Sequence, residues 1–173
     1  PHRIDRPTSG VVLFAKTSKA LSRINKQFHD REVTKTYWAI VKKGELKKED
    51  RLIHFLKRFP EKNKSIAYNK EVEGSKRAEL SYKIIQELDN YFLLEINPVT
   101  GRHHQIRSQL SAIGFPIRGD IKYGYDRTNR DASINLHARR LELVHPVSKE
   151  LIKLKGNLPK TDPVWKACSK IKS

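Results

Sequence analysis

The sequence predicts an α+β fold, with a mixed, largely antiparallel sheet and helices packed against it. Apolar residues alternate along residues 33–41, 78–88 and 91–96, which predicts strands with one buried face. Around residues 17–30 and 103–113 the apolar side chains instead recur with helical spacing. A chain of 173 residues is long enough for one domain with a proper core.

The composition indicates a polyanionic partner. Lys and Arg number 36 against 19 Asp and Glu, and the resulting charge of +17 is spread along the whole chain. Such a charge favours a nucleic acid bound through salt-dependent phosphate contacts. An anionic membrane is the weaker alternative, because no apolar run approaches the roughly 18 residues of a membrane span. The single cysteine, Cys168, cannot form an internal disulfide, which fits a reducing, cytoplasmic location.

The first ten residues hold an acid in a basic turn. Asp5 lies between Arg3 and Arg6, and the proline and glycine that follow predict a tight, non-helical turn. Residues 11–15 are then expected to form a buried strand. Nearby positive charge favours the ionised form of a carboxyl group, which suits a nucleophile that works close to phosphates. Taken alone, the pattern also fits an acid that neutralises a basic loop or closes an Asx-turn.

The first half of the chain continues with a helix, a strand and a basic segment. Residues 17–30 form a helix with a threonine or serine cap. In the strand of residues 33–41, Tyr37 and Trp38 point to opposite faces. The charge-rich residues 45–75 contain two apolar runs, which predict small strands on a basic peripheral lobe. This lobe fits phosphate positioning and a plain solvated hairpin equally well.

The second half is predicted to form two hairpins and two helices. The hairpin of residues 78–96 leads to Arg102, at the start of the helix of residues 103–113. From the residues alone, two roles compete for Arg102: a phosphate contact, or the ion-pair partner of the acid in the first motif. A hairpin over residues 136–154 and a short helix capped by Asp162 complete the prediction.

Four motifs, taken together and in this order, resemble those of the RluA-like pseudouridine synthases. They are His2-Arg3-Ile4-Asp5-Arg6-Pro7-Thr8-Ser9-Gly10, Lys35-Thr36-Tyr37, Thr100-Gly101-Arg102-His103-His104-Gln105-Ile106-Arg107, and Leu136-His137-Ala138 with His145-Pro146. They are spread over nearly the whole chain, so the set is far more specific than any one motif. The resemblance implies a pseudouridine synthase fold with a central RNA-binding cleft.

The resemblance also implies an activity: the isomerisation of uridine to pseudouridine in structured ribosomal or transfer RNA, without cofactor or metal. Asp5 would be the nucleophile. Tyr37 would stack on the flipped base and is a candidate base in proton transfer, and Arg102 would pair with Asp5. The expected substrate-binding residues are Arg3, Arg6, His104, Ile106 and Arg107. The two histidines of the last motif, His137 and His145, would support the site through hydrogen bonds.

Two other functions stay open, together with the extent of the domain. One is a catalytically silent, basic RNA-binding domain. The other is a hydrolytic or glycosidase-like enzyme, which would need a second carboxylate across the bond, and no other acid stands in a comparable motif. The family carries further strands upstream of the nucleophile motif. Residues 1–173 are therefore expected to form a single, monomeric catalytic domain that lacks its N-terminal portion.

Overall fold

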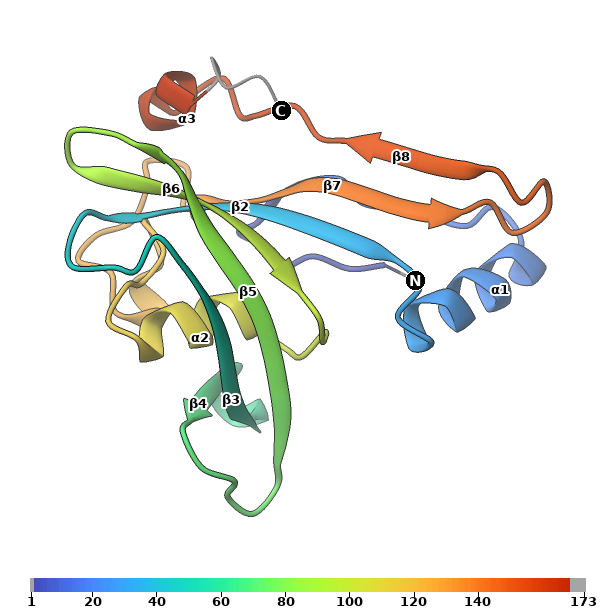
Figure 1. Cartoon of the computed structure of the whole chain (residues 1–173), viewed down its shortest axis with the longest axis horizontal. Coiled ribbons are helices and arrows are strands. Elements are labelled where there is room, and N and C mark those ends of the chain that lie inside the picture. The colour runs from blue at the N-terminus through green and yellow to red at the C-terminus, as the bar shows by residue number, and fades with distance from the viewer. Residues whose placement is uncertain (1, 169–173) are drawn as a thin grey trace.

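One mixed sheet runs through residues 2–168, the part of the chain that this computed structural model describes (Figure 1). Its strands are β1 (Ser9–Gly10), β2 (Thr34–Lys42), β3 (Glu49–Phe59), β4 (Lys64–Tyr68), β5 (Ser75–Glu87), β6 (Tyr91–Pro98), β7 (Leu136–Val144) and β8 (Leu151–Lys155). They follow the order β1-β7-β2-β6-β5-β3-β4, and β8 also pairs with β7. The pairing of β1 with β7 is parallel and the other pairings are antiparallel. The predicted mixed, largely antiparallel sheet is confirmed.

Three α-helices pack on this sheet, at the places where the sequence predicts them. They are α1 (Ser18–His29), α2 (Gln105–Ala112) and α3 (Pro163–Cys168), with short 3-10 turns at η1 (Pro60–Lys62) and η2 (Ile121–Tyr123). The hydroxyl of Thr17 accepts the N–H of Ala20 and caps α1, and the carboxylate of Asp162 accepts the N–H of Val164 at the start of α3. No helix within residues 2–168 is long and apolar enough to cross a membrane.

Consecutive residues of β2 enter different cores. Ala39 packs in the apolar cluster under α2, whereas Trp38 packs in the cluster under α3. A third cluster joins α1 to β7 through Ile24 and Leu141. The predicted alternation along β2 is confirmed, and α1 and α2 lie on the face opposite α3 (Figure 1).

One strand prediction was wrong and another was incomplete. Residues 11–15 do not form a buried strand: β1 ends at Gly10, Val11 adds one backbone hydrogen bond to Ala138, and the Phe14 side chain is 77% exposed. The N–H of Leu13 donates to His2 Nδ1 rather than to a neighbouring strand. Residues 45–75 form more than small strands, because β3 pairs along its length with β5 as well as with β4. Alternate β3 side chains are buried, and this buried face holds the long strand in the main sheet.

Candidate active site

The turn that carries Asp5 is fixed to the sheet by β1. The N–H of Thr8 donates to the carbonyl oxygen of Asp5 at 2.8 Å, which closes the predicted turn. Gly10 then pairs with Ala138 of β7 and has a φ of +117°. A Cβ at Gly10 would lie 2.3 Å from the carbonyl oxygen of Ala138, so only glycine allows this approach. The close β1–β7 contact therefore determines where Asp5 lies.

Arg107 of α2 holds the carboxylate of Asp5. Its Nη1 lies 3.3 Å from Asp5 Oδ2, while its Nε and Nη2 donate to the two carboxylate oxygens of Asp120 at 2.7 and 2.8 Å. The guanidinium also lies over the ring of Tyr123, 4.9 Å from its centroid. Burial acts to lower the pKa of Arg107, but the hydrogen bonds and charges of the two carboxylates raise it overall. The cation is thus fixed in place before any substrate arrives.

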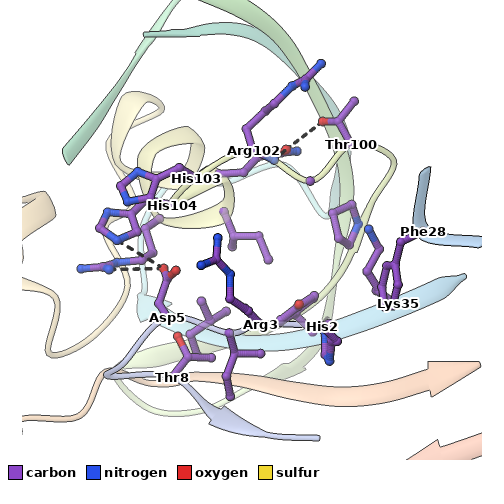
Figure 2. Close-up of a pocket in the computed structure, with 18 of the residues that line it drawn as sticks. His2, Arg3, Asp5, Thr8, Phe28, Lys35, Thr100, Arg102, His103 and His104 are labelled. Carbon is purple, nitrogen blue, oxygen red and sulfur yellow. Dashed lines mark hydrogen bonds and ion pairs between the residues drawn. The ribbon is translucent and has the colours of Figure 1, made fainter. Parts of the chain in front are cut away.

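The expected pairing of Arg102 with Asp5 was wrong. Arg102 is exposed, and its Nε donates to the backbone carbonyl oxygen of Arg77. Figure 2 shows Arg102 pointing away from Asp5. Its contact with Arg77 holds it away from Asp5, and α2 begins at Gln105, two residues later than predicted. Arg102 therefore lies in the preceding loop, and Arg107, within the first turn of the helix, faces Asp5.

His104 supplies a second group beside Asp5. Its Nε2 lies 3.8 Å from Asp5 Oδ2, and its Nδ1 lies 2.9 Å from the hydroxyl oxygen of Tyr123. That oxygen accepts the N–H of Ser65 and can donate its own proton to Nδ1, an arrangement that places the His104 proton on Nε2. Burial, followed by the charge of Arg107, lowers the pKa of His104 to about 3. A neutral ring thus directs an N–H toward the carboxylate.

The two histidines before α2 lie against each other. Their rings stack with centroids 3.8 Å apart at an angle of 20°. His104 has a φ of +49°, so it lies outside the helix. His103 Nδ1 lies 2.9 Å from the hydroxyl oxygen of Ser65. No cluster of three or more residues suited to a metal ion occurs within residues 2–168.

A cavity of about 610 Å³ opens beside Asp5, with Phe28 of α1 and Ile106 of α2 in its lining. The predicted site residues in this lining are Arg3, Asp5, Tyr37, Arg102, His104, Ile106 and Arg107. Arg6 is exposed and is not among the lining residues. Burial, with a further contribution from the charge of Asp5, raises the pKa of Tyr37 to about 12. The arrangement thus combines a carboxylate, a fixed cation and a neutral phenol at one opening.

Of the two histidines expected to support the site, the structure places one there. His137 is buried, and its Nδ1 lies 2.8 Å from the hydroxyl oxygen of Ser9, which ties β1 to β7 as predicted. His145 instead lies in the turn between β7 and β8, where its Nδ1 accepts the N–H of Ser148 at 3.0 Å. Its role is to order that turn.

Several residues of the site were not predicted from the sequence. Asp120 and Tyr123 come from the segment between α2 and β7, in which the sequence motifs name no site residue. Their local signal was an acid after a glycine, followed by a tyrosine one turn later. Phe28 of α1 lines the cavity although its helical spacing predicted only a core role. Lys35, two residues before Tyr37 in the second motif, also lines the cavity, although the sequence predicted no role for it.

The fold and this constellation define the class of a pseudouridine synthase catalytic domain. The family profile described as RNA pseudouridylate synthase matches residues 1–112. The tRNA pseudouridine synthase C of Vibrio vulnificus is 33% identical over 181 residues, which cover 95% of this chain and 72% of the relative. The ribosomal large subunit pseudouridine synthase C of the same species is 31% identical over 178 residues, or 99% of this chain and 55% of that relative.

Solved structures agree with these relatives. Human RNA pseudouridylate synthase domain containing 1 matches with a TM-score of 0.80 and 25% identity, covering 96% of this chain and 71% of that chain. Human RNA pseudouridylate synthase domain containing 4 has a TM-score of 0.78 at 23% identity, which supports the fold. The chain belongs to the RNA pseudouridylate synthase family, whose members isomerise uridine to pseudouridine, and the resemblance to the RluA-like synthases is confirmed.

Proposed function

We propose that the protein isomerises specific uridines in ribosomal or transfer RNA, with Asp5 as the nucleophile. The observation that carries this proposal is the Asp5 carboxylate, held by Arg107 at 3.3 Å beside a cavity of about 610 Å³. The reaction breaks the bond between ribose C1′ and uracil N1 and joins C1′ to C5. N1 gains a proton and C5 loses one, so the isomerisation needs no oxidant, reductant or phosphoryl donor.

The two oxygens of the Asp5 carboxylate have different surroundings. Arg107 and His104 both approach Oδ2, at 3.3 and 3.8 Å. Among the described residues no partner engages Oδ1, so Oδ1 is the oxygen that faces the substrate. A carboxylate placed in this way can act at the sugar or at the base edge of an extruded uridine. The positioned donors on Oδ2 restrict the rotation of the carboxylate and pre-organise the nucleophile.

Tyr37 acts by stacking on the extruded uracil. With its pKa at about 12, only about one molecule in 10⁵ carries the phenolate at neutral pH, which disfavours a role as the base. An aromatic ring in a nucleic-acid cavity instead gives the base a stacking partner. Ile106, which is buried in the adjacent core, supplies an apolar wall. These contacts would hold the detached base while it turns to present C5 to C1′.

Two exposed arginines at the cavity are assigned to the RNA. Arg3 is two residues from the nucleophile and lines the cavity, so it occupies the space that the extruded uridine leaves in the RNA. Arg102 also lines the cavity without pairing to Asp5, which leaves the phosphate contact as its role. Arg3→Ala is expected to slow turnover on structured RNA more than on an unstructured oligonucleotide, and equal losses on both would contradict this assignment.

The competing functions fit the site less well. A glycosidase needs a second carboxylate across the scissile bond, and Asp120 is 1% exposed and engaged by Arg107. A silent RNA-binding domain does not require a nucleophile with two oriented donors. The relatives named for transfer RNA and for ribosomal RNA are similarly close, so both substrates belong to the proposal. The protein would act as a monomeric catalytic domain on RNA in the cytoplasm.

The experiment that tests this proposal compares the wild-type protein with Asp5→Asn. Each is incubated with RNA from cells that lack the enzyme, and pseudouridine is mapped by carbodiimide treatment and primer extension. New sites with the wild type alone, while both proteins bind the RNA, would support the synthase and identify its substrate. Tight binding without new sites would favour the silent binder, and activity in Asp5→Asn would mean that another residue is the nucleophile.

A further inference from the structure

On the side of the cavity away from Asp5, a buried histidine has an unused nitrogen. His2 is 8% exposed, and its ring stacks on Phe28 of α1 with centroids 5.4 Å apart. Its Nδ1 accepts the N–H of Leu13 at 3.4 Å, whereas its Nε2 has no partner among residues 2–168. Figure 2 shows His2 and Phe28 across the cavity from Asp5. Buried polar atoms are nearly always satisfied, so an unpaired Nε2 on a residue that lines the cavity points to a ligand.

Lys35 of β2 is a cation without a counter-ion next to this histidine. It lines the same cavity and is half-buried, and no carboxylate of the described residues contacts it. Burial and then the charge of Arg31 lower the pKa of Lys35. After burial, the charge of Lys35 is the next cause that lowers the pKa of His2, so the two groups are close enough to interact. Both nitrogens would therefore be stabilised by one anion.

Other lysines of the sheet are arranged differently. Lys83 lies 3.2 Å from Glu95, and Lys43 forms an ion pair with Glu87. Lys35 is set in the wall of the cavity and has no such partner, although burial of an unpaired charge is unfavourable. The substrate of the proposed reaction is itself a polyanion that enters this cavity, and it can supply the missing charge.

We propose that Lys35 and His2 bind one phosphodiester of the RNA strand next to the flipped uridine. This assignment rests on the proposed function and extends it to a specific contact. Lys35 and Tyr37 are two residues apart on one face of β2, so their Cα atoms are separated by about 7 Å. A base stacked on Tyr37 thus brings the backbone of its own or the adjoining nucleotide to Lys35. Phe28, stacked on His2, holds the histidine ring in place.

The test removes the charge of the RNA linkage and the charge of Lys35 separately. RNA substrates carry a single uncharged methylphosphonate at each linkage around the target uridine, and pseudouridine formation is measured as kcat/KM. For the wild type, one linkage beside the target should cost about tenfold when neutralised, as expected for a hydrogen bond to a charged group. Lys35→Gln should lose about tenfold on unmodified RNA, and the same methylphosphonate should then cause no further loss.

A matched variant and a charge-retaining one complete the experiment. Lys153→Gln removes the same charge from exposed β8 and should respond to every methylphosphonate as the wild type does. Lys35→Arg should keep the sensitivity at the chosen linkage. The slope of the logarithm of the RNA-binding constant against the logarithm of the salt concentration should become shallower by about 0.7 in Lys35→Gln. The same change is expected for the wild type on RNA with the neutral linkage.

The proposal would be overturned if Lys35→Gln kept the full wild-type sensitivity at every linkage, or if the wild type responded to none. The wild-type scan does not depend on how any variant folds. If the proposed function itself were wrong, the wild type would form no pseudouridine in any substrate, which is a different result from active enzyme without phosphate coupling.

Discussion

Replacement of Arg107 by lysine separates the geometry of the site from its charge. Arg107 donates three hydrogen bonds, two to Asp120 and one to Asp5. A lysine keeps the positive charge but cannot donate from a planar fork to two carboxylates at once. Arg107→Lys should therefore retain RNA binding while leaving Asp5 poorly oriented.

The contacts give the size of the effect. Loss of one hydrogen bond to a charged group costs about 1.5–3 kcal/mol, which corresponds to a fall in kcat of about ten- to a hundredfold. Asp120 is 1% exposed, so the oxygen left without a donor should lower the free energy of unfolding by a further ~1–3 kcal/mol. The rate is measured in single turnover with saturating RNA, and stability by urea unfolding.

Arg102→Gln is the matched comparison, five residues earlier in the same motif. Because Arg102 is exposed and does not contact Asp5, this variant should raise KM and leave the single-turnover rate at saturating RNA close to that of the wild type. The reverse pattern, with a slow Arg102→Gln and a fully active Arg107→Lys, would refute the assignment of Arg107 as the residue that positions the nucleophile.

Three further predictions follow from the same contacts. Tyr37→Phe should remain within about tenfold of the wild-type kcat, whereas Tyr37→Ala should lose about 1–3 kcal/mol of base stacking; a thousandfold loss in Tyr37→Phe would restore the role of a base. The pKa of His104 is about 3 when folded, so the unfolded chain takes up the proton first on acidification. The free energy of unfolding, measured with urea, should therefore fall by about 1.4 kcal/mol per pH unit below about pH 6. His104→Asn should remove this contribution to the pH dependence, and an unchanged pH dependence would count against a buried neutral ring. Gly10→Ala should cost at least about 1–3 kcal/mol by thermal unfolding and reduce activity, because its Cβ would meet the backbone of Ala138; unchanged stability would show that β1 does not hold the turn.

Local signals in the sequence were sufficient for much of the fold. The Thr17 cap and the apolar spacing that follows predicted α1, since both act within a few residues of chain. The alternation along β2 predicted which side chains enter each core, because strand geometry itself sets that period. Residues 11–15 were mistaken for a strand because they form an unbroken apolar run, of which Val11, Leu13 and Ala15 pack beside α1 instead of extending the pairing of β1.

The site depended on geometry that no local pattern specified. Arg102 was expected to pair with Asp5 and Arg107 to bind substrate, but the folded chain directs Arg102 to the Arg77 carbonyl oxygen and Arg107 to Asp5. Asp120 and Tyr123 reach Arg107 from a separate loop, so their contribution appears only once the chain has folded. The motif resemblance pointed to Asp5 as the candidate nucleophile, whereas the contacts that orient Asp5 are visible only in the folded structure.

The loss of hydrogen from uracil C5 tests the central claim most directly. An RNA substrate labelled with tritium at C5 of uridine releases the label only when C5 bonds to C1′. The wild-type protein should release tritium in proportion to the pseudouridine formed, and Asp5→Asn should bind the same RNA and release none. Release by Asp5→Asn at the wild-type rate would contradict the assignment of Asp5 as the nucleophile.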